Sequence, residues 1–204
     1  SRGLGDVYKR QGVYRTQVSL RQALQMSYNV ATVRLSEKIG RDLTIKMAHR
    51  LGINAKLDDK PSLALGSSGV SLINMTAAYV AISNGGFPVE PYGISSIVTE
   101  KGELIYTRRE QTATPIASSK VIEDMNRMLE GVIAGGTGKK ANIGRTAAGK
   151  TGTSQDYRDA WFIGYSGGLT VGVWVGRDDN RPMRKITGGS IPAKIWGEFM
   201  VNVP

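Results

Sequence analysis

The spacing of apolar residues changes along the chain, and this change constrains the fold more than any other feature. Between residues 19 and 84, apolar side chains recur every three or four positions, which is the spacing of a helix with one buried face. Residues 147–176 instead form three short apolar runs joined by brief polar or glycine-rich turns, which favours antiparallel strands. A chain of 204 residues is long enough for one domain with a buried core. We therefore expect an α+β domain in which a helical lobe precedes an antiparallel sheet.

Local signals predict where the elements begin and end. Ser19 and Gln22 form a capping box, so a helix is expected from Ser19 to about Met26. A helix break is expected at 27–29, then a second helix to Ile39 with a left-handed Gly40, a third helix capped by Asp42, and a loop over 53–66. Further helices are expected over Ser71–Asn84 and Ser119–Ala134, and a hairpin of Ile94–Thr99 with Glu103–Thr107 lies between them. Strands are expected over Ala147–Ser154, Ala160–Tyr165 and Leu169–Gly176, followed by a covering C-terminal helix from Pro192 with Ile195, Trp196, Phe199 and Met200 facing inward.

Composition excludes several classes of function. The 27 Lys and Arg against 17 Asp and Glu give a net charge of +10, but the basic residues are scattered without interleaved aromatics. We therefore interpret them as a solvated surface and expect no nucleic-acid binding. The chain has no cysteine and no tight carboxylate cluster, and its one histidine, His49, stands alone, so no metal site is expected. No other cofactor is expected either.

Two short patterns could carry chemistry. Ser27-Tyr28-Asn29 lies at a predicted helix junction, and Lys150-Thr151-Gly152-Thr153 lies on a predicted strand. Either pattern alone is weak, because a Ser-x-Asn often only caps a helix and a strand lysine is often only solvated. In this order, however, they correspond to two of the three motifs that penicillin-binding proteins and class A β-lactamases use, the third being Ser-x-x-Lys.

The surrounding residues sharpen the match. The strings SLRQALQMSYNVATVRLSEKIG, LALGSSGVSLINMTAAYVAISNGG, GTGKKA, AAGKTGTSQDYRDAWFIGY and VWVGRDD with TGGSIPAKIW resemble the transpeptidase domain of class A penicillin-binding proteins over residues 12–204. This resemblance implies a penicillin-binding/serine β-lactamase-like transpeptidase fold. It also implies a parent peptidoglycan D,D-transpeptidase, which would cross-link D-Ala-D-Ala stem peptides through an acyl-serine and bind β-lactams. Such a parent is expected to be anchored at the extracytoplasmic face of the cytoplasmic membrane and to carry a glycosyltransferase domain.

The resemblance also implies roles for the motif residues. Ser27 would relay a proton to the departing D-alanine, and Asn29 would bind the substrate amide and hold the catalytic lysine. Lys150 would supply positive potential for the substrate carboxylate and share a hydrogen-bond network with Ser27.

Thr151 and Thr153 would bind that carboxylate through their hydroxyls. Gly152 would let the substrate lie against the strand, and the N–H of Thr153 would form half of an oxyanion hole.

One motif of the family is absent. No lysine of the chain has a serine three positions before it, so the nucleophile is expected outside this chain. The isolated chain is therefore expected to be inactive and poorly stable, because the family's N-terminal strands would also be missing and the strand Leu169–Gly176 would keep an unpaired edge. Residues 1–11 resemble translated adapter sequence, and we interpret them as a leader whose native origin stays open.

Three interpretations remain beside each other. The first is the transpeptidase fragment, the second a serine β-lactamase, and the third a non-catalytic β-lactam sensor or wall-binding module. The inserted hairpin and the long stretch between the two motifs favour a penicillin-binding protein over a compact β-lactamase. Asp159 is interpreted as a turn residue, with Trp161 and Phe162 in the core. Gly136-Thr137-Gly138 follows a helix, which argues against a phosphate loop.

Overall fold

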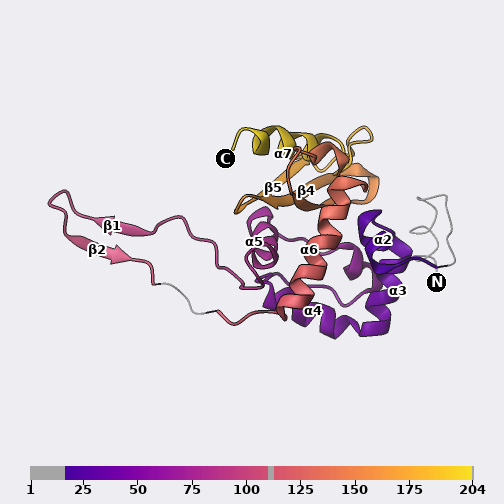
Figure 1. Cartoon of the computed structure of the whole chain (residues 1–204), viewed down its shortest axis with the longest axis horizontal. Coiled ribbons are helices and arrows are strands. Elements are labelled where there is room, and N and C mark those ends of the chain that lie inside the picture. Colours follow the sequence, from indigo (N-terminus) through magenta and orange to yellow (C-terminus); the bar gives the residue numbers. More distant parts are fainter. Residues whose placement is uncertain (1–16, 110–112, 204) are drawn as a thin grey trace.

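Helices and sheet form separate layers that meet along one long helix, α6. The computed structural model describes residues 17–109 and 113–203, and the leader over 1–11 lies outside these residues. Figure 1 shows α2–α4 grouped on one side of α6 and the sheet with α7 on the other, while the β1–β2 hairpin projects far from the body. The α+β class expected from the sequence is confirmed. No helix in the described ranges combines the length and apolarity needed to cross a bilayer.

The helical lobe begins where the capping pattern predicts. The Ser19 side chain accepts a hydrogen bond from the N–H of Gln22, and α2 follows it. Two details of the prediction were wrong. Gly40 has a positive φ but an extended ψ rather than a left-handed conformation, and Gly40, not Asp42, caps α4. The lobe consists of α2 (Leu20–Gln25), α3 (Asn29–Ile39) and α4 (Arg41–Arg50).

A short 3-10 helix, η1 (Pro61–Leu65), lies within the segment that was expected to be a loop. Pro61 stands at its first turn, where the missing N–H of proline costs nothing. Next comes α5 (Leu72–Ser83), whose first turn is capped by the side chain of Ser71. The sequence predicts a helix over Ser71–Asn84, and the observed helix lies within these bounds.

The long helix α6 (Ser119–Ala134) has the bounds that its apolar stripe predicts. Ile122, Leu129 and Val132 recur at helical spacing and are buried, because this face lies between the two layers. Its contacts with α2, α5 and β3 make α6 the common support of the helical lobe and the sheet.

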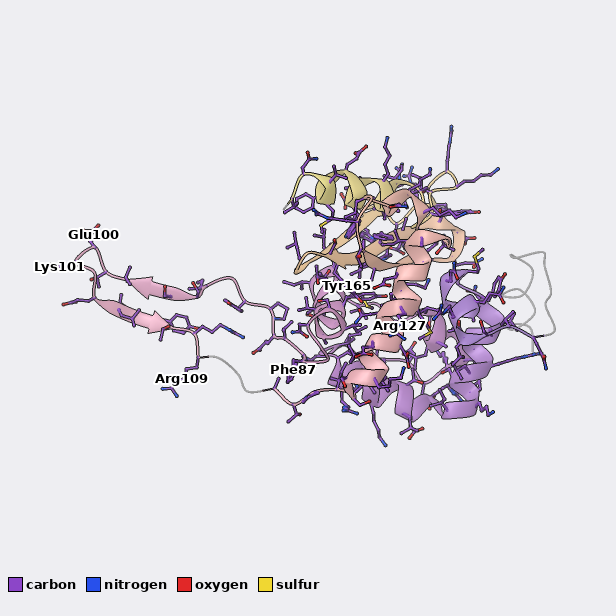
Figure 2. The ribbon with its side chains drawn as sticks, viewed as in Figure 1. Phe87, Glu100, Lys101, Arg109, Arg127 and Tyr165 are labelled. Atoms are coloured by element: carbon purple, nitrogen blue, oxygen red, sulfur yellow. The ribbon has the colours of Figure 1, made fainter. Side chains whose placement is uncertain are left out.

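The inserted hairpin consists of β1 (Ser96–Val98) and β2 (Leu104–Thr107), with every strand residue exposed. Figure 2 shows Glu100 and Lys101 at its tip and Phe87 near its base. A guanidinium–ring contact helps to hold the base, because Arg108 lies 4.1 Å from the centre of the Tyr92 ring.

The sheet is an antiparallel meander in the order β3-β4-β5, with short connections as expected. Its strands are β3 (Ala148–Thr153), β4 (Asp159–Ser166) and β5 (Leu169–Gly176). In the described part of the chain both β3 and β5 have an edge without a partner strand, so the unpaired edge expected for Leu169–Gly176 is observed.

The C-terminal helix α7 (Ile191–Val201) covers the sheet and completes the core. Trp196 is fully buried, packs edge-on against Phe162 at 5.3 Å between ring centres and donates to Gly164 O. The inward orientation predicted for four residues of this helix is correct for Trp196 and Met200 but wrong for Ile195 and Phe199, which are 43% and 50% exposed. The buried face of α7 is centred on Ala193, Trp196 and Met200, so at 100° per residue Ile195 and Phe199 lie on its flank.

Candidate functional site

Ser27 lies at the junction between α2 and α3, in a backbone conformation that presents its side chain to the sheet. Its φ is +55°, which is uncommon for a residue other than glycine. Two backbone bonds hold the turn: Ser27 N–H donates to Leu24 O and Tyr28 N–H donates to Ala23 O. The helix break that the sequence predicts at this position is therefore a tight turn with its hydroxyl directed at a neighbouring element.

Lys150 on β3 reaches that hydroxyl. Its Nζ donates to Ser27 Oγ at 2.8 Å and to the carbonyl oxygen of Thr151 at 2.9 Å. The loss of water around the buried ammonium lowers the pKa of Lys150 from 10.5 to about 8. At neutral pH the group still carries its charge, so it places positive potential beside Ser27.

Asn29 is the first residue of α3 and is half-buried, two positions from Ser27. Its two expected contacts, with the substrate amide and with the catalytic lysine, stay predictions.

Thr151, Gly152 and Thr153 follow Lys150 along the unpaired edge of β3. Ser154 N–H donates to Asp159 O of the neighbouring chain segment, and N–H directions alternate along a strand. The N–H of Thr153 therefore points away from β4 and out of the open edge. The carbonyl of Thr151 points the same way, which is where Lys150 Nζ reaches it.

Packing against β4 is tight at Gly152. A Cβ there would lie 3.2 Å from the Cβ of its strand partner Trp161, so a larger residue would require a shift of a few tenths of an ångström. The structure thus brings Ser27, Lys150 and the strand residues together at one edge of the sheet.

Two further residues touch this edge and were missed by the sequence reasoning. Thr137, in the loop after α6, lies with its Oγ1 2.7 Å from that of Thr151. Gly188, ahead of α7, donates its N–H to Thr153 Oγ1 at 3.1 Å. Their glycine-rich surroundings were the available signal, but such strings alone do not indicate which strand they will contact.

The remaining singled-out residues have structural roles. His49, in the last turn of α4, contacts the carbonyl oxygen of Ile53 through Nδ1 at 2.7 Å. Asp159 begins β4 and accepts a hydrogen bond from Trp174 Nε1 at 3.0 Å.

Known proteins share this architecture and sequence. The chain matches the model of the penicillin binding protein transpeptidase domain over residues 2–200. It is 36% identical over 187 residues to penicillin-binding protein 1A of Aquifex aeolicus, covering 90% of this chain and 25% of that protein. It is 32% identical over 197 residues to penicillin-binding protein 1B of Vibrio cholerae, covering 95% of this chain and 25% of that protein. The chain thus spans about a quarter of the length of both relatives.

Solved structures superpose on most of the chain. The complex of PonA1 from Mycobacterium tuberculosis with penicillin V matches with a TM-score of 0.84 and 25% identity, over 93% of this chain and 57% of that one. Penicillin-binding protein 1A from Haemophilus influenzae, at 24% identity and a TM-score of 0.81, covers 92% of this chain and 35% of that one and shares the fold. Together with the family match over nearly the whole sequence, these results place the chain in the penicillin binding protein transpeptidase domain family, with its penicillin-binding/β-lactamase-like fold.

Proposed function

We propose that this chain is part of a serine-type D,D-transpeptidase that cross-links peptidoglycan stem peptides and is acylated by β-lactams. The observation that carries the proposal is the contact between Lys150 and Ser27, beside an open strand edge that ends in two threonine hydroxyls. A cation, a relay hydroxyl and outward N–H groups on one edge are what acyl transfer from a peptide carboxyl terminus requires.

The edge of β3 would bind the donor peptide as an added strand. The N–H of Thr153 points outward and is suited to hold the oxyanion of the tetrahedral intermediate, as half of an oxyanion hole. The terminal carboxylate would lie near Thr151 and Thr153, in the positive potential of Lys150. Gly152 between them has no side chain, which would let the substrate lie close against the strand.

Ser27 would move the proton in this reaction. Its Oγ accepts from the Lys150 ammonium, which lowers the cost of charge developing on the serine oxygen. The hydroxyl would pass its proton to the nitrogen of the leaving D-alanine and take up the proton that the nucleophilic serine releases, so the relay ends as it began. Asn29, two positions on, would bind the substrate's backbone amide.

The nucleophile would come from an upstream Ser-x-x-Lys segment of the parent protein. We infer that this parent lies in the cell envelope, is anchored in the membrane and carries a glycosyltransferase domain. The relatives named penicillin-binding protein 1A and 1B support this arrangement. The chain by itself should not form an acyl-enzyme.

Fluorescent penicillin labelling tests the proposal. The full-length parent should form a covalent adduct that persists for minutes, and the chain over residues 1–204 should form none. Ser27→Ala in the parent should slow acylation by roughly 10²–10⁴-fold, the range for a lost acid–base group. The exposed hairpin variant Thr107→Val is the matched control and should label like the wild type.

The other outcomes identify the alternatives. Rapid release of hydrolysed penicillin would identify a β-lactamase. A stable adduct without any D-alanine release from a stem peptide would identify a sensor, and covalent labelling of the isolated chain would contradict the expected inactivity.

A further inference from the structure

Thr137 connects the two elements that carry the site. Its backbone N–H donates to the carbonyl oxygen of Gln25, the last residue of α2 and two positions before Ser27. Its side-chain Oγ1 lies 2.7 Å from Oγ1 of Thr151 on β3. One residue outside both motifs therefore bonds to the helical lobe and to the sheet.

Close packing around Thr137 restricts movement of the loop that contains it. A Cβ on Gly136 would overlap the carbonyl oxygen of Gln25, and one on Gly138 would lie 3.0 Å from the Phe162 ring. From the other side, a Cβ on Gly189 would overlap the carbonyl oxygen of Thr137. The backbone of residue 137 is thus fixed by close contacts with α2, with β4 and with the turn ahead of α7.

We propose that Thr137 is a positioning residue that orients the Thr151 hydroxyl towards the carboxylate of the ligand. This inference rests on the proposed function, because it assigns a carboxylate to the open edge of β3. Thr137 would not touch the reacting atoms, and its effect would pass through Thr151.

The physical argument concerns the single hydrogen that each hydroxyl carries. Within the Thr137–Thr151 pair only one hydroxyl can donate to the other. When Thr137 donates, the oxygen of Thr151 is satisfied and its own hydrogen is left to donate elsewhere. A carboxylate accepts but cannot donate, so it favours this arrangement, and the two bonds then strengthen each other. The bond to Thr137 also selects one of the three staggered positions of the Thr151 side chain.

The inference predicts a preference among ligands. A ligand with a free carboxylate should depend on Thr137, whereas the methyl ester of the same ligand should not, because an ester attracts the Thr151 hydroxyl much more weakly. A hydrogen bond to a charged group is worth about 1.5–3 kcal/mol, which corresponds to a loss of roughly 10–100-fold.

The test compares Thr137→Val, Thr137→Ser and the control Thr107→Val in the full-length parent, using penicillin G and its methyl ester. Thr137→Val should lower the second-order acylation constant roughly 10–100-fold for the acid and only about twofold for the ester. Thr137→Ser, which keeps the hydroxyl, should restore most of the rate. With Thr151→Val as background, Thr137→Val should have little further effect. Equal losses for acid and ester, or additive losses in the double variant, would overturn the inference.

A second measurement does not depend on acylation. In the full-length parent, three-bond couplings of the Thr151 methyl group report its side-chain rotamer. The wild type and Thr137→Ser should hold one rotamer, and Thr137→Val should average among several. A single unchanged rotamer in Thr137→Val would overturn the inference, whether or not the parent reacts with penicillin. Absence of acylation in the wild-type parent would instead contradict the proposed function.

Discussion

The Nζ of Lys150 lies 2.8 Å from Oγ of Ser27, although the two residues are 123 positions apart in the sequence. The contact joins the turn between α2 and α3 to the edge of the sheet. It forms because α6 lies between the layers and contacts both α2 and β3. The chemistry at this edge therefore depends on how the two layers pack.

Buried Lys150 should give the chain a pH-dependent stability. Burial lowers its pKa from 10.5 to about 8, so between these values the unfolded chain binds more protons than the folded one. The free energy of unfolding should therefore rise with pH from about 8 to 10.5, by on the order of 3 kcal/mol in total. Below pH 8 the destabilisation from the buried charge is present in full.

The measurement is urea unfolding of the wild-type chain and of Lys150→Met across this pH range. Other groups titrate in both proteins, so the difference between the two curves isolates Lys150. Lys150→Met should be the more stable protein at pH 7, and parallel curves would contradict the pKa shift.

Replacing Gly188, which belongs to neither motif, should disturb the strand that carries Gly152 and Thr153. A Cβ at this position would overlap the carbonyl oxygen of Trp161 and lie 2.5 Å from that of Gly152. Gly188→Ala should therefore move the turn, weaken its bond to Thr153 and lower the free energy of unfolding by roughly 1–3 kcal/mol. Gly93→Ala, where nothing lies within 4 Å, is the matched control and should be neutral in thermal unfolding.

The two faces of α7 should differ sharply in their response to truncation. Trp196→Ala should cost about 3–5 kcal/mol, because it leaves a cavity against Phe162. Ile195→Ala, one residue earlier and 43% exposed, should change the free energy of unfolding by less than about 1 kcal/mol. Chemical denaturation of both variants decides the matter, and similar losses would show that the outer face is also packed.

Removal of the hairpin should leave the body intact. Every residue of β1 and β2 is exposed, so a short Gly-Ser link in place of residues 94–107 removes little buried surface. The free energy of unfolding should stay within about 1 kcal/mol of the wild-type value, since closing a loop of a different length has a small entropic effect. A cooperative transition at a much lower temperature would instead reveal contacts that stabilise the body.

The sequence predicts those features of the fold that are set locally. The Ser19 cap, the stripe of α6 and the bounds of β5 follow from short-range patterns, and the structure confirms them. Periodicity does not say which partner covers an apolar face, and this is why Ile195 was wrongly assigned to the core.

The site was harder to predict because its contacts are long-range. The pairing of Ser27 with Lys150 was expected only through the resemblance to a family. Thr137 lies outside both motifs. It contacts the site through two long-range bonds, a backbone bond to α2 and a side-chain bond to β3. No local pattern encodes these two bonds.

The position of α6 between the layers implies that the chain cannot tolerate changes in length equally everywhere. One residue inserted into this helix would advance its end by about 1.5 Å and rotate it by about 100°. Thr137 would then be carried away from both Gln25 and Thr151. Insertions and deletions should thus be tolerated in the projecting hairpin. The length of α6, 16 residues, should instead be constrained, because it sets the distance between the turn at Ser27 and strand β3.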